Sequence, residues 1–200
     1  MEWVNLLFFK LLLDWKTQVL EKFPESIVAK QNLASFIKEK SDTKLSQTQF
    51  MELFSDGNSS DVDRLAYARF TQSAAENQFD SQEVVESLLR IAEGKSSLSR
   101  VAAGDLLRYT SSSIKAASER GEMTETFLSA ALDRSYAVIL QDESITDPDF
   151  ENYALAKCSI RPSISSDELD NLLKITELRN QYRLFLDLQL LVAERSGNKD

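Results

Sequence analysis

Histidine is absent from this chain of 200 residues, and cysteine occurs once, at Cys158. Without histidine, the chain lacks the side chain that most often serves as a general base and as a metal ligand. Ser-His-Asp and Cys-His catalytic sites are therefore excluded within the chain, and so are the familiar Cys/His zinc sites. Glycine-rich phosphate-binding motifs and Gly-x-Ser-x-Gly are missing as well. The sequence thus predicts no cofactor and no metal site, and it argues against an enzyme.

A single cysteine cannot form an intrachain disulfide, which favours a reducing compartment, and we expect a cytoplasmic protein. The formal net charge is -9. An acidic chain repels the phosphates of nucleic acids, so we expect no nucleic-acid partner. Acidic residues gather within 141–170, where they could contact a basic partner surface. A solvated rim is the more common role of such a group.

Breakers of secondary structure are also scarce, with only 5 glycines and 3 prolines. Leu, Ala, Ser and Glu are plentiful, which is typical of helices. Dense runs of Val, Ile and Thr, which would predict strands, are absent. Apolar periodicity and capping signals predict helices that begin near residues 2, 25, 46, 61, 81, 97, 124, 148 and 165. Because the connections between these helices are short, we expect helices that follow one another in the sequence to pack antiparallel. We expect an all-α protein of about nine helices in stacked antiparallel pairs, as an irregular α-solenoid or a compact bundle.

The most turn-rich stretch of the sequence lies at residues 55–60, Ser-Asp-Gly-Asn-Ser-Ser. It predicts a flexible joint between N-terminal helices at 1–54 and a main helical array at 61–196. A polar tail follows at 197–200.

The longest apolar pattern covers residues 165–196 and begins with a capping box, Ser165-x-x-Glu168. The spacing predicts one continuous helix with a buried face centred near Phe185. A stripe of this breadth must be covered by other helices or by another protein, because soluble monomers rarely expose so large an apolar patch. The face comprises Leu169, Leu172, Ile175, Leu178, Tyr182, Phe185, Leu188 and Val192, widened by Leu173, Leu184, Leu186, Leu190 and Leu191.

Residues 3–13 form a second strongly apolar segment. It is shorter than the roughly 20 residues of a membrane span, and Lys10 and Asp14 interrupt it. It has no basic n-region and no small-residue cleavage site, so we expect no signal peptide. We expect a buried first helix whose tryptophans are core aromatics, with a membrane or partner contact as the alternative. The candidate interface residues at the two ends of the chain are Trp3, Phe8, Leu12, Trp15, Leu178, Tyr182, Phe185, Leu188 and Val192.

Few side-chain pairs in the sequence suggest chemistry. Glu83 and Glu86 lie three residues apart on a predicted helix, and Ser111 and Lys115 have the spacing of a Ser-Lys dyad. Both arrangements are typical of an ordinary helix surface. A carboxylate-dependent magnesium hydrolase stays open as an alternative, and its test is whether three of four carboxylates converge in one pocket. These are Asp105, Asp133, Asp142 and Glu143.

Two segments, LLRIAEGKSSLSRVAAGDLLRYT and LLKITELRNQYRLFLDLQLLVAERS, resemble pieces of the irregular α-solenoids of very large scaffold proteins. The chain is similar in texture to the rough-deal kinetochore and vesicle-tether class and to nucleoporin solenoids. The resemblance implies an excerpt or short form of a longer protein, associated with a kinetochore or with endomembranes, and it assigns no functional residue. We therefore expect a non-enzymatic scaffold or adaptor that binds helical or basic surfaces of other proteins. The alternatives are the magnesium hydrolase and a membrane-peripheral protein that uses its N-terminal helix.

Overall fold

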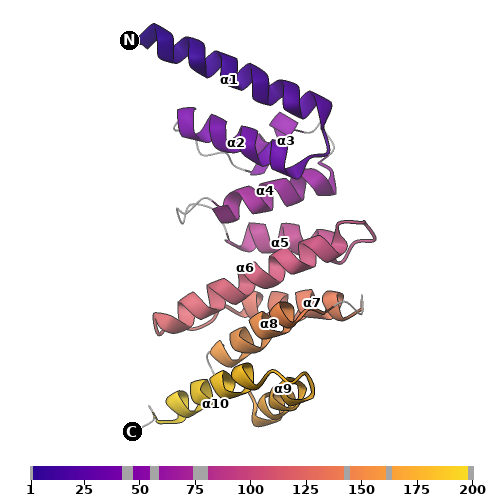
Figure 1. Cartoon of the computed structure of the whole chain (residues 1–200), viewed down its shortest axis with the longest axis vertical. Coiled ribbons are helices and arrows are strands. Elements are labelled where there is room, and N and C mark those ends of the chain that lie inside the picture. The colour runs from indigo at the N-terminus through magenta and orange to yellow at the C-terminus, as the bar shows by residue number, and fades with distance from the viewer. Residues whose placement is uncertain are drawn as a thin grey trace. The chain divides into compact units, whose positions relative to one another are not determined.

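The structure, a computed structural model, describes residues 2–41, 47–54, 59–73, 81–141, 145–160 and 164–197. Over these ranges the chain is helical and contains no strand, which confirms the all-α prediction (Figure 1). The helices are α1 (Glu2–Lys22), α2 (Ile27–Ser41), α3 (Gln47–Phe54), α4 (Asp61–Ser73), α5 (Ser81–Ala92), α6 (Ser99–Glu119), α7 (Thr126–Gln141), α8 (Asp147–Ser159), α9 (Ser166–Leu178) and α10 (Tyr182–Gly197).

The chain forms two compact units, Met1–Leu98 with α1 to α5 and Ser99–Asp200 with α6 to α10. Within each unit, helices that follow one another from α1 to α2, α4 to α5 and α6 to α8 alternate in direction (Figure 1). The predicted joint at 55–60 falls inside the first unit. Its residues 55–58 lie outside the described ranges, so the joint stays a prediction.

Helix α4 is the centre of the first unit, because it contacts α2, α3 and α5. Its Tyr67 and Phe70 are buried against Phe50 of α3, with ring centroids 5.5 and 6.0 Å from that of Phe50. Ala34 of α2 completes this cluster. Helix α1 packs on α2 and forms one end of the unit.

The second unit is built around α6, which packs against both α7 and α8. Its buried positions include Ala102, Ala103 and Thr110, and small side chains of this kind let neighbouring helices approach closely. Helix α8 also contacts α10, which in turn contacts α9. The core that these three helices share contains Phe150, Ala154, Cys158, Leu172, Leu184 and Leu188.

The predicted continuous helix over residues 165–196 is wrong, because the segment forms two helices separated by a turn. Asn180 has a φ of +56°, in the left-handed region that ends many helices. Its N–H donates to the Glu177 carbonyl, and the N–H of Gln181 donates to the Thr176 carbonyl, both at 3.0 Å. These two bonds form a Schellman motif, which terminates α9. The nine predicted starts lie within two residues of observed ones, and this break supplies the tenth helix.

Candidate interaction surface

Helix α10 carries apolar side chains on two opposite sides. Leu184 and Leu188 are buried in the core shared with α8 and α9. Leu186 lies two residues before Leu188, and two residues along an α-helix turn a side chain by about 200°. Leu186 is accordingly 63% exposed, and Tyr182 and Leu190, one turn to either side, are 68% and 60% exposed. We call Tyr182, Leu186 and Leu190 the outer face of α10.

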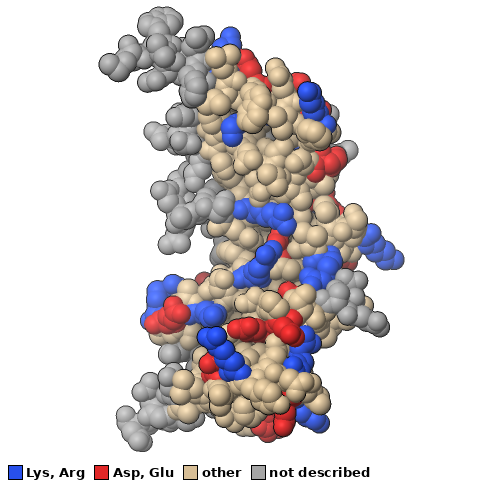
Figure 2. Space-filling view, viewed as in Figure 1, with Lys and Arg blue, Asp and Glu red and all other residues tan. Residues whose placement is uncertain are grey.

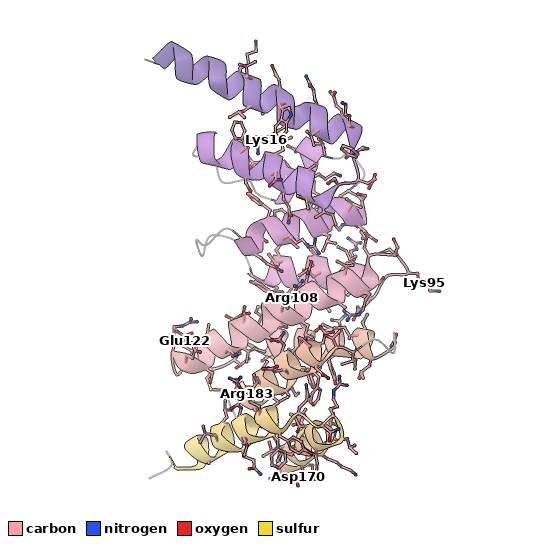
Figure 3. All side chains as sticks on the ribbon, viewed as in Figure 1. Lys16, Lys95, Arg108, Glu122, Asp170 and Arg183 are labelled. Atoms are coloured by element: carbon pink, nitrogen blue, oxygen red, sulfur yellow. The ribbon has the colours of Figure 1, made fainter. Side chains whose placement is uncertain are left out.

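An apolar outer face is unusual for a helix at a protein surface, where the side away from the core is ordinarily polar. Here the outer face is open to solvent, and Leu178, which ends α9 just before the turn, is 75% exposed. Arg183 and Asp187 are exposed and lie on one flank of the outer face (Figure 3 labels Arg183). Among the described side chains, the outer face thus combines large apolar groups with a flank that carries one charge of each sign, Arg183 and Asp187.

The structure does not bring the predicted stripe of the last segment together on one buried face. Leu188 is fully buried and Phe185 is half-buried, but Leu178 and Tyr182 point to solvent. The side chain of Val192 lies outside the described residues. The left-handed residue between α9 and α10 changes the direction of the chain, so a helical pattern continued through it no longer describes one face.

The first helix exposes apolar side chains too. Leu11 and Trp15, one turn apart on α1, are each 60% exposed, so the prediction of Trp15 as a core aromatic is wrong. Leu12 is half-buried. The side chains of Trp3 and Phe8 lie outside the described residues. Among the helices as far as they are described, none combines the length and the apolarity needed to cross a membrane.

Lys16 holds α1 to α2. Its ammonium group donates to the main-chain carbonyl of Asn32 at 3.1 Å and lies 5.1 Å from the centroid of the Phe36 ring (Figure 3). An ammonium over an aromatic face is attracted by the negative potential of the ring. The side of α1 that carries Lys16 is therefore the one packed on α2, and Leu11 and Trp15 remain exposed.

A polar cluster connects α7, α8 and α9 in the second unit. The ammonium of Lys157 lies 3.1 Å from the Asp133 carboxylate and 3.5 Å from that of Glu168, and only 9% of the Lys157 side chain is exposed. The Tyr153 hydroxyl donates to Asp133 at 3.0 Å. A lysine this buried needs such partners, because an unpaired charge in the interior is costly. The cluster therefore fixes three helices relative to one another.

Tyr153 stacks on Tyr136 of α7, with ring centroids 3.8 Å apart and planes inclined by 5°. Burial raises the pKa of the Tyr153 hydroxyl well above its ordinary value, and the negative charge of Asp133 raises it further. Burial likewise raises the pKa of Tyr136. A general base or a nucleophilic phenolate needs the opposite shift at neutral pH. Tyr153 is thus suited to donating a hydrogen bond and unsuited to accepting a proton.

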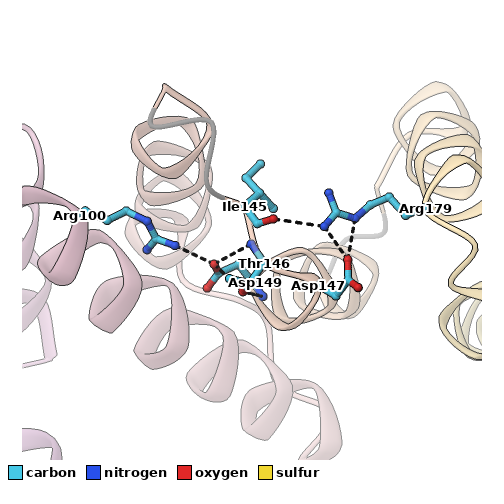
Figure 4. A network of polar contacts seen from close by, with 6 residues as sticks. All are labelled: Arg100, Ile145, Thr146, Asp147, Asp149 and Arg179. Atoms are coloured by element: carbon cyan, nitrogen blue, oxygen red, sulfur yellow. Dashed lines mark hydrogen bonds and ion pairs between the residues drawn. The ribbon is translucent and has the colours of Figure 1, made fainter.

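A second polar network surrounds the start of α8 (Figure 4). Thr146 and Asp149 form a capping box, and Arg100 of α6 reaches the Asp149 carboxylate at 2.8 Å. From the end of α9, Arg179 pairs with Asp147 at 2.6 Å and donates to the Ile145 carbonyl. The acidic stretch, for which a solvated rim was the favoured interpretation and a basic partner the alternative, is therefore partly neutralised from within the unit. The sequence pattern missed both arginines, because Arg100 and Arg179 lie 49 and 32 residues along the chain from the carboxylates that they pair with.

Arg179 also covers the aromatic ring of Phe150, with its guanidinium carbon 5.5 Å from the ring centroid. The guanidinium thus binds Asp147 and Ile145 and also lies over the Phe150 ring, a combination of contacts that suits arginine better than lysine. This contact links the end of α9 to the first turn of α8 and supports the turn at Asn180.

The catalytic arrangements considered from the sequence are not assembled in the described part of the chain. Ser111 is buried and its hydroxyl has no hydrogen-bond partner there, whereas Lys115 is exposed. The carboxylate of Asp105 pairs with Arg108. Within the described ranges, no three His, Cys, Asp or Glu side chains gather closely enough to hold a metal ion. Asp142 and Glu143 lie outside those ranges.

Charged side chains of both signs are interspersed over the face drawn in Figure 2, with broad uncharged areas between them. No large patch of one sign gathers on the second unit in this view. Comparisons of the chain with models of known families, with curated proteins and with solved structures find no match.

Proposed function

We propose that this chain is a non-enzymatic scaffold or adaptor that binds other proteins through exposed helix faces. The observation that carries the proposal is the outer face of α10, where three large apolar side chains at helical spacing are each at least 60% exposed. Apolar surface of this kind is stabilised when a partner removes it from water, at about 25 cal/mol per Å². Contiguous exposed apolar patches commonly mark interaction sites.

The placement of the polar side chains supports the same proposal. The buried or half-buried charges of the second unit pair across helix junctions, as Lys157 does between α7, α8 and α9 and as Arg100 does between α6 and α8. Groups engaged in this way stabilise helix packing. No observation on the described residues favours the magnesium hydrolase, whose four carboxylates include two outside those residues.

A membrane-peripheral role ranks second and rests on Leu11 and Trp15, because an exposed tryptophan suits a membrane interface. Against it, the exposed charges along α1 have both signs, with Lys10 and Lys22 offset by Asp14 and Glu21. Interfacial helices generally have a basic polar face that anionic lipids attract. The α10 face therefore carries the first proposal.

The cellular setting belongs to the same proposal. The solenoid-like texture of the sequence supports a role as a segment of a larger multisubunit tether or kinetochore assembly. The one cysteine, Cys158, is buried and cannot form an intrachain disulfide, which supports a cytoplasmic location.

Affinity purification of the full chain from cells tests the proposed function, with co-purifying proteins identified for three forms. Leu186→Glu places a charge in the outer face of α10, and it should remove the proteins that wild type captures. Leu140→Glu is the matched control, because Leu140 is a 50% exposed leucine on α7. It should leave the captured set unchanged. Equal captured sets for wild type and Leu186→Glu would contradict a binding role for this face.

A further inference from the structure

Arg183 and Asp187 lie one turn apart on the same flank of the outer face of α10, and both are exposed. A flank with opposite charges at this spacing is complementary to itself when two copies of the helix meet in opposite directions. We propose that the outer face of α10 binds the same face of a second copy of this chain, with the two α10 helices antiparallel. The inference rests on the proposed function and names the partner of that site.

The pairing follows from the symmetry of two antiparallel helices. A two-fold axis perpendicular to the plane of the two helices places equivalent flanks side by side and reverses their order along the helix. Arg183 of one copy then lies opposite Asp187 of the other, and the same contact occurs twice. The midpoint of this charge pair is one residue, or about 1.5 Å, from Leu186, the centre of the apolar face. One register therefore satisfies both the charges and the apolar side chains.

A parallel arrangement does not have this property. In parallel helices, the charged flank of one copy faces the opposite flank of the other, which carries Phe185 and Gln189. Arg183 and Asp187 would then have no opposite charge across the interface. The charge pattern therefore selects the antiparallel arrangement.

The same pattern disfavours strongly charged partners. A basic helix on this flank would repel Arg183, and an acidic helix would repel Asp187. On α1, Lys10 and Asp14 form a similar pair of opposite charges beside the exposed Leu11 and Trp15. Among the described side chains, that face presents two large apolar groups, whereas the outer face of α10 presents three. The larger apolar face therefore favours α10 as the site of the second copy.

The size of the face sets the expected affinity. Helix α10 has 16 residues and is about 24 Å long. One helix face with a neighbouring exposed leucine, Leu178, is smaller than the roughly 800 Å² per partner of a standard interface. We therefore expect a weak dimer, with a dissociation constant on the order of 10 μM.

Sedimentation equilibrium of the purified full chain, over concentrations from about 1 to 200 μM, measures this dimer. Wild type should shift from monomer to dimer across the range. Leu186→Glu should stay monomeric, and Leu140→Glu, which alters a comparably exposed leucine on α7, should dimerise as wild type does. Circular dichroism of all three forms checks that the helices are intact. A wild-type chain that is monomeric throughout, or a Leu186→Glu chain that still dimerises, would overturn the proposal.

Charge exchange tests the direction of the helices. R183D and D187R chains should each self-associate about tenfold more weakly than wild type, because each places like charges opposite one another twice. Mixed in equal amounts, the two variants should form a heterodimer close to wild-type affinity, because every facing pair is then of opposite sign. The doubly exchanged R183D/D187R chain should dimerise as wild type does. A mixture that associates no better than its components would exclude the antiparallel register.

These measurements separate this inference from the proposed function. If the wild-type chain is monomeric but Leu186→Glu still abolishes the capture of other proteins, the dimer is excluded and the scaffold role is retained. A chain that neither self-associates nor loses any captured protein would contradict both.

Discussion

Lys30 on α2 and Asp63 on α4 form an ion pair in which both side chains are buried, with 6% and 3% of their surfaces exposed. The second carboxylate oxygen of Asp63 accepts hydrogen bonds from the N–H and the hydroxyl of Ser60, at 3.0 and 2.8 Å. The same carboxylate thus caps the start of α4 and joins α4 to α2. Because Lys30 precedes Asp63 by 33 residues and Ser60 precedes it by 3, the Asp63 carboxylate couples long-range and local structure.

Asp63→Ala should lower the free energy of unfolding by about 3–5 kcal/mol, because it leaves the Lys30 ammonium buried without its partner. The double variant Lys30→Met with Asp63→Leu should cost much less, since no charge is then left in the interior. Urea unfolding followed by circular dichroism measures both. The exposed pair Arg120–Glu122 is the control, and Glu122→Ala should leave the unfolding midpoint unchanged. An Asp63→Ala effect as small as that of Glu122→Ala would show that the buried pair does not stabilise the fold.

The two sides of α10 provide a matched pair of leucine substitutions. Leu188→Ala should cost about 2–5 kcal/mol, because Leu188 is fully buried and its truncation leaves a cavity. Leu186→Ala, on the exposed side, should change the stability by no more than about 0.5 kcal/mol at concentrations where the chain is monomeric. Similar losses for the two variants would mean that both sides of α10 are covered within one chain.

The positions of the helices could be predicted from the sequence because their signals are local. The capping box at Ser165 and the glycine at Gly121 lie within one turn of the helix ends that they define. Gly121 and Asn180 terminate α6 and α9 with the same pair of backbone hydrogen bonds. Glycine is the residue that most often ends a helix in this way. The stop at Asn180 was not predicted, because the apolar pattern of residues 165–196 continues through it.

The candidate surface could be predicted only in part, because it depends on contacts between helices as well as on local signals. Tyr182 and Leu178 were assigned to an interface and are exposed, but Leu186 was assigned to the same stripe as Leu188, from which it points away. Periodicity gives the relative angle of residues within one helix and does not say which side meets the core. That choice is made by long-range packing against α8. Contacts such as Lys30 with Asp63 leave no local pattern at all.

Tyr153 should resist ionisation more than a tyrosine in water does. Its folded pKa lies above the value of about 10 that it has in an unfolded chain. The neutral hydroxyl therefore adds stability that is fully present below about pH 10 and is lost as the pH rises through the folded pKa. A spectrophotometric titration at 295 nm should lose a transition above about pH 10 in Tyr153→Phe. Loss of an early transition instead would place the hydroxyl in water.

At Glu168 we expect the opposite dependence of stability on pH, in the acid range. The Ser165 N–H and hydroxyl bind its carboxylate, and together with Lys157 they lower the pKa of Glu168 below its ordinary value. The stability that the carboxylate contributes is present above the unfolded pKa of about 4.3 and is lost as the pH falls through the folded pKa. Glu168→Ala should flatten the acid limb of a plot of unfolding midpoint against pH. Because half of the side chain is exposed, solvent screening keeps this effect small.

Asn180 is the residue on which the orientation of α10, and hence its outer face, depends. Asn180→Ala should destabilise the second unit by about 1 kcal/mol, because a Cβ without a local hydrogen-bonding group disfavours the left-handed conformation. Asn180→Gly should keep the turn, since glycine adopts positive φ readily. Hydrogen exchange of the Asn180 and Gln181 amides, which donate to α9 carbonyls, measures the turn directly. These amides should lose protection in Asn180→Ala and keep it in Asn180→Gly. If the alanine variant keeps both the protection and the dimer, the turn is set by Arg179 and its contacts with Asp147 and Phe150, and not by the residue at its apex.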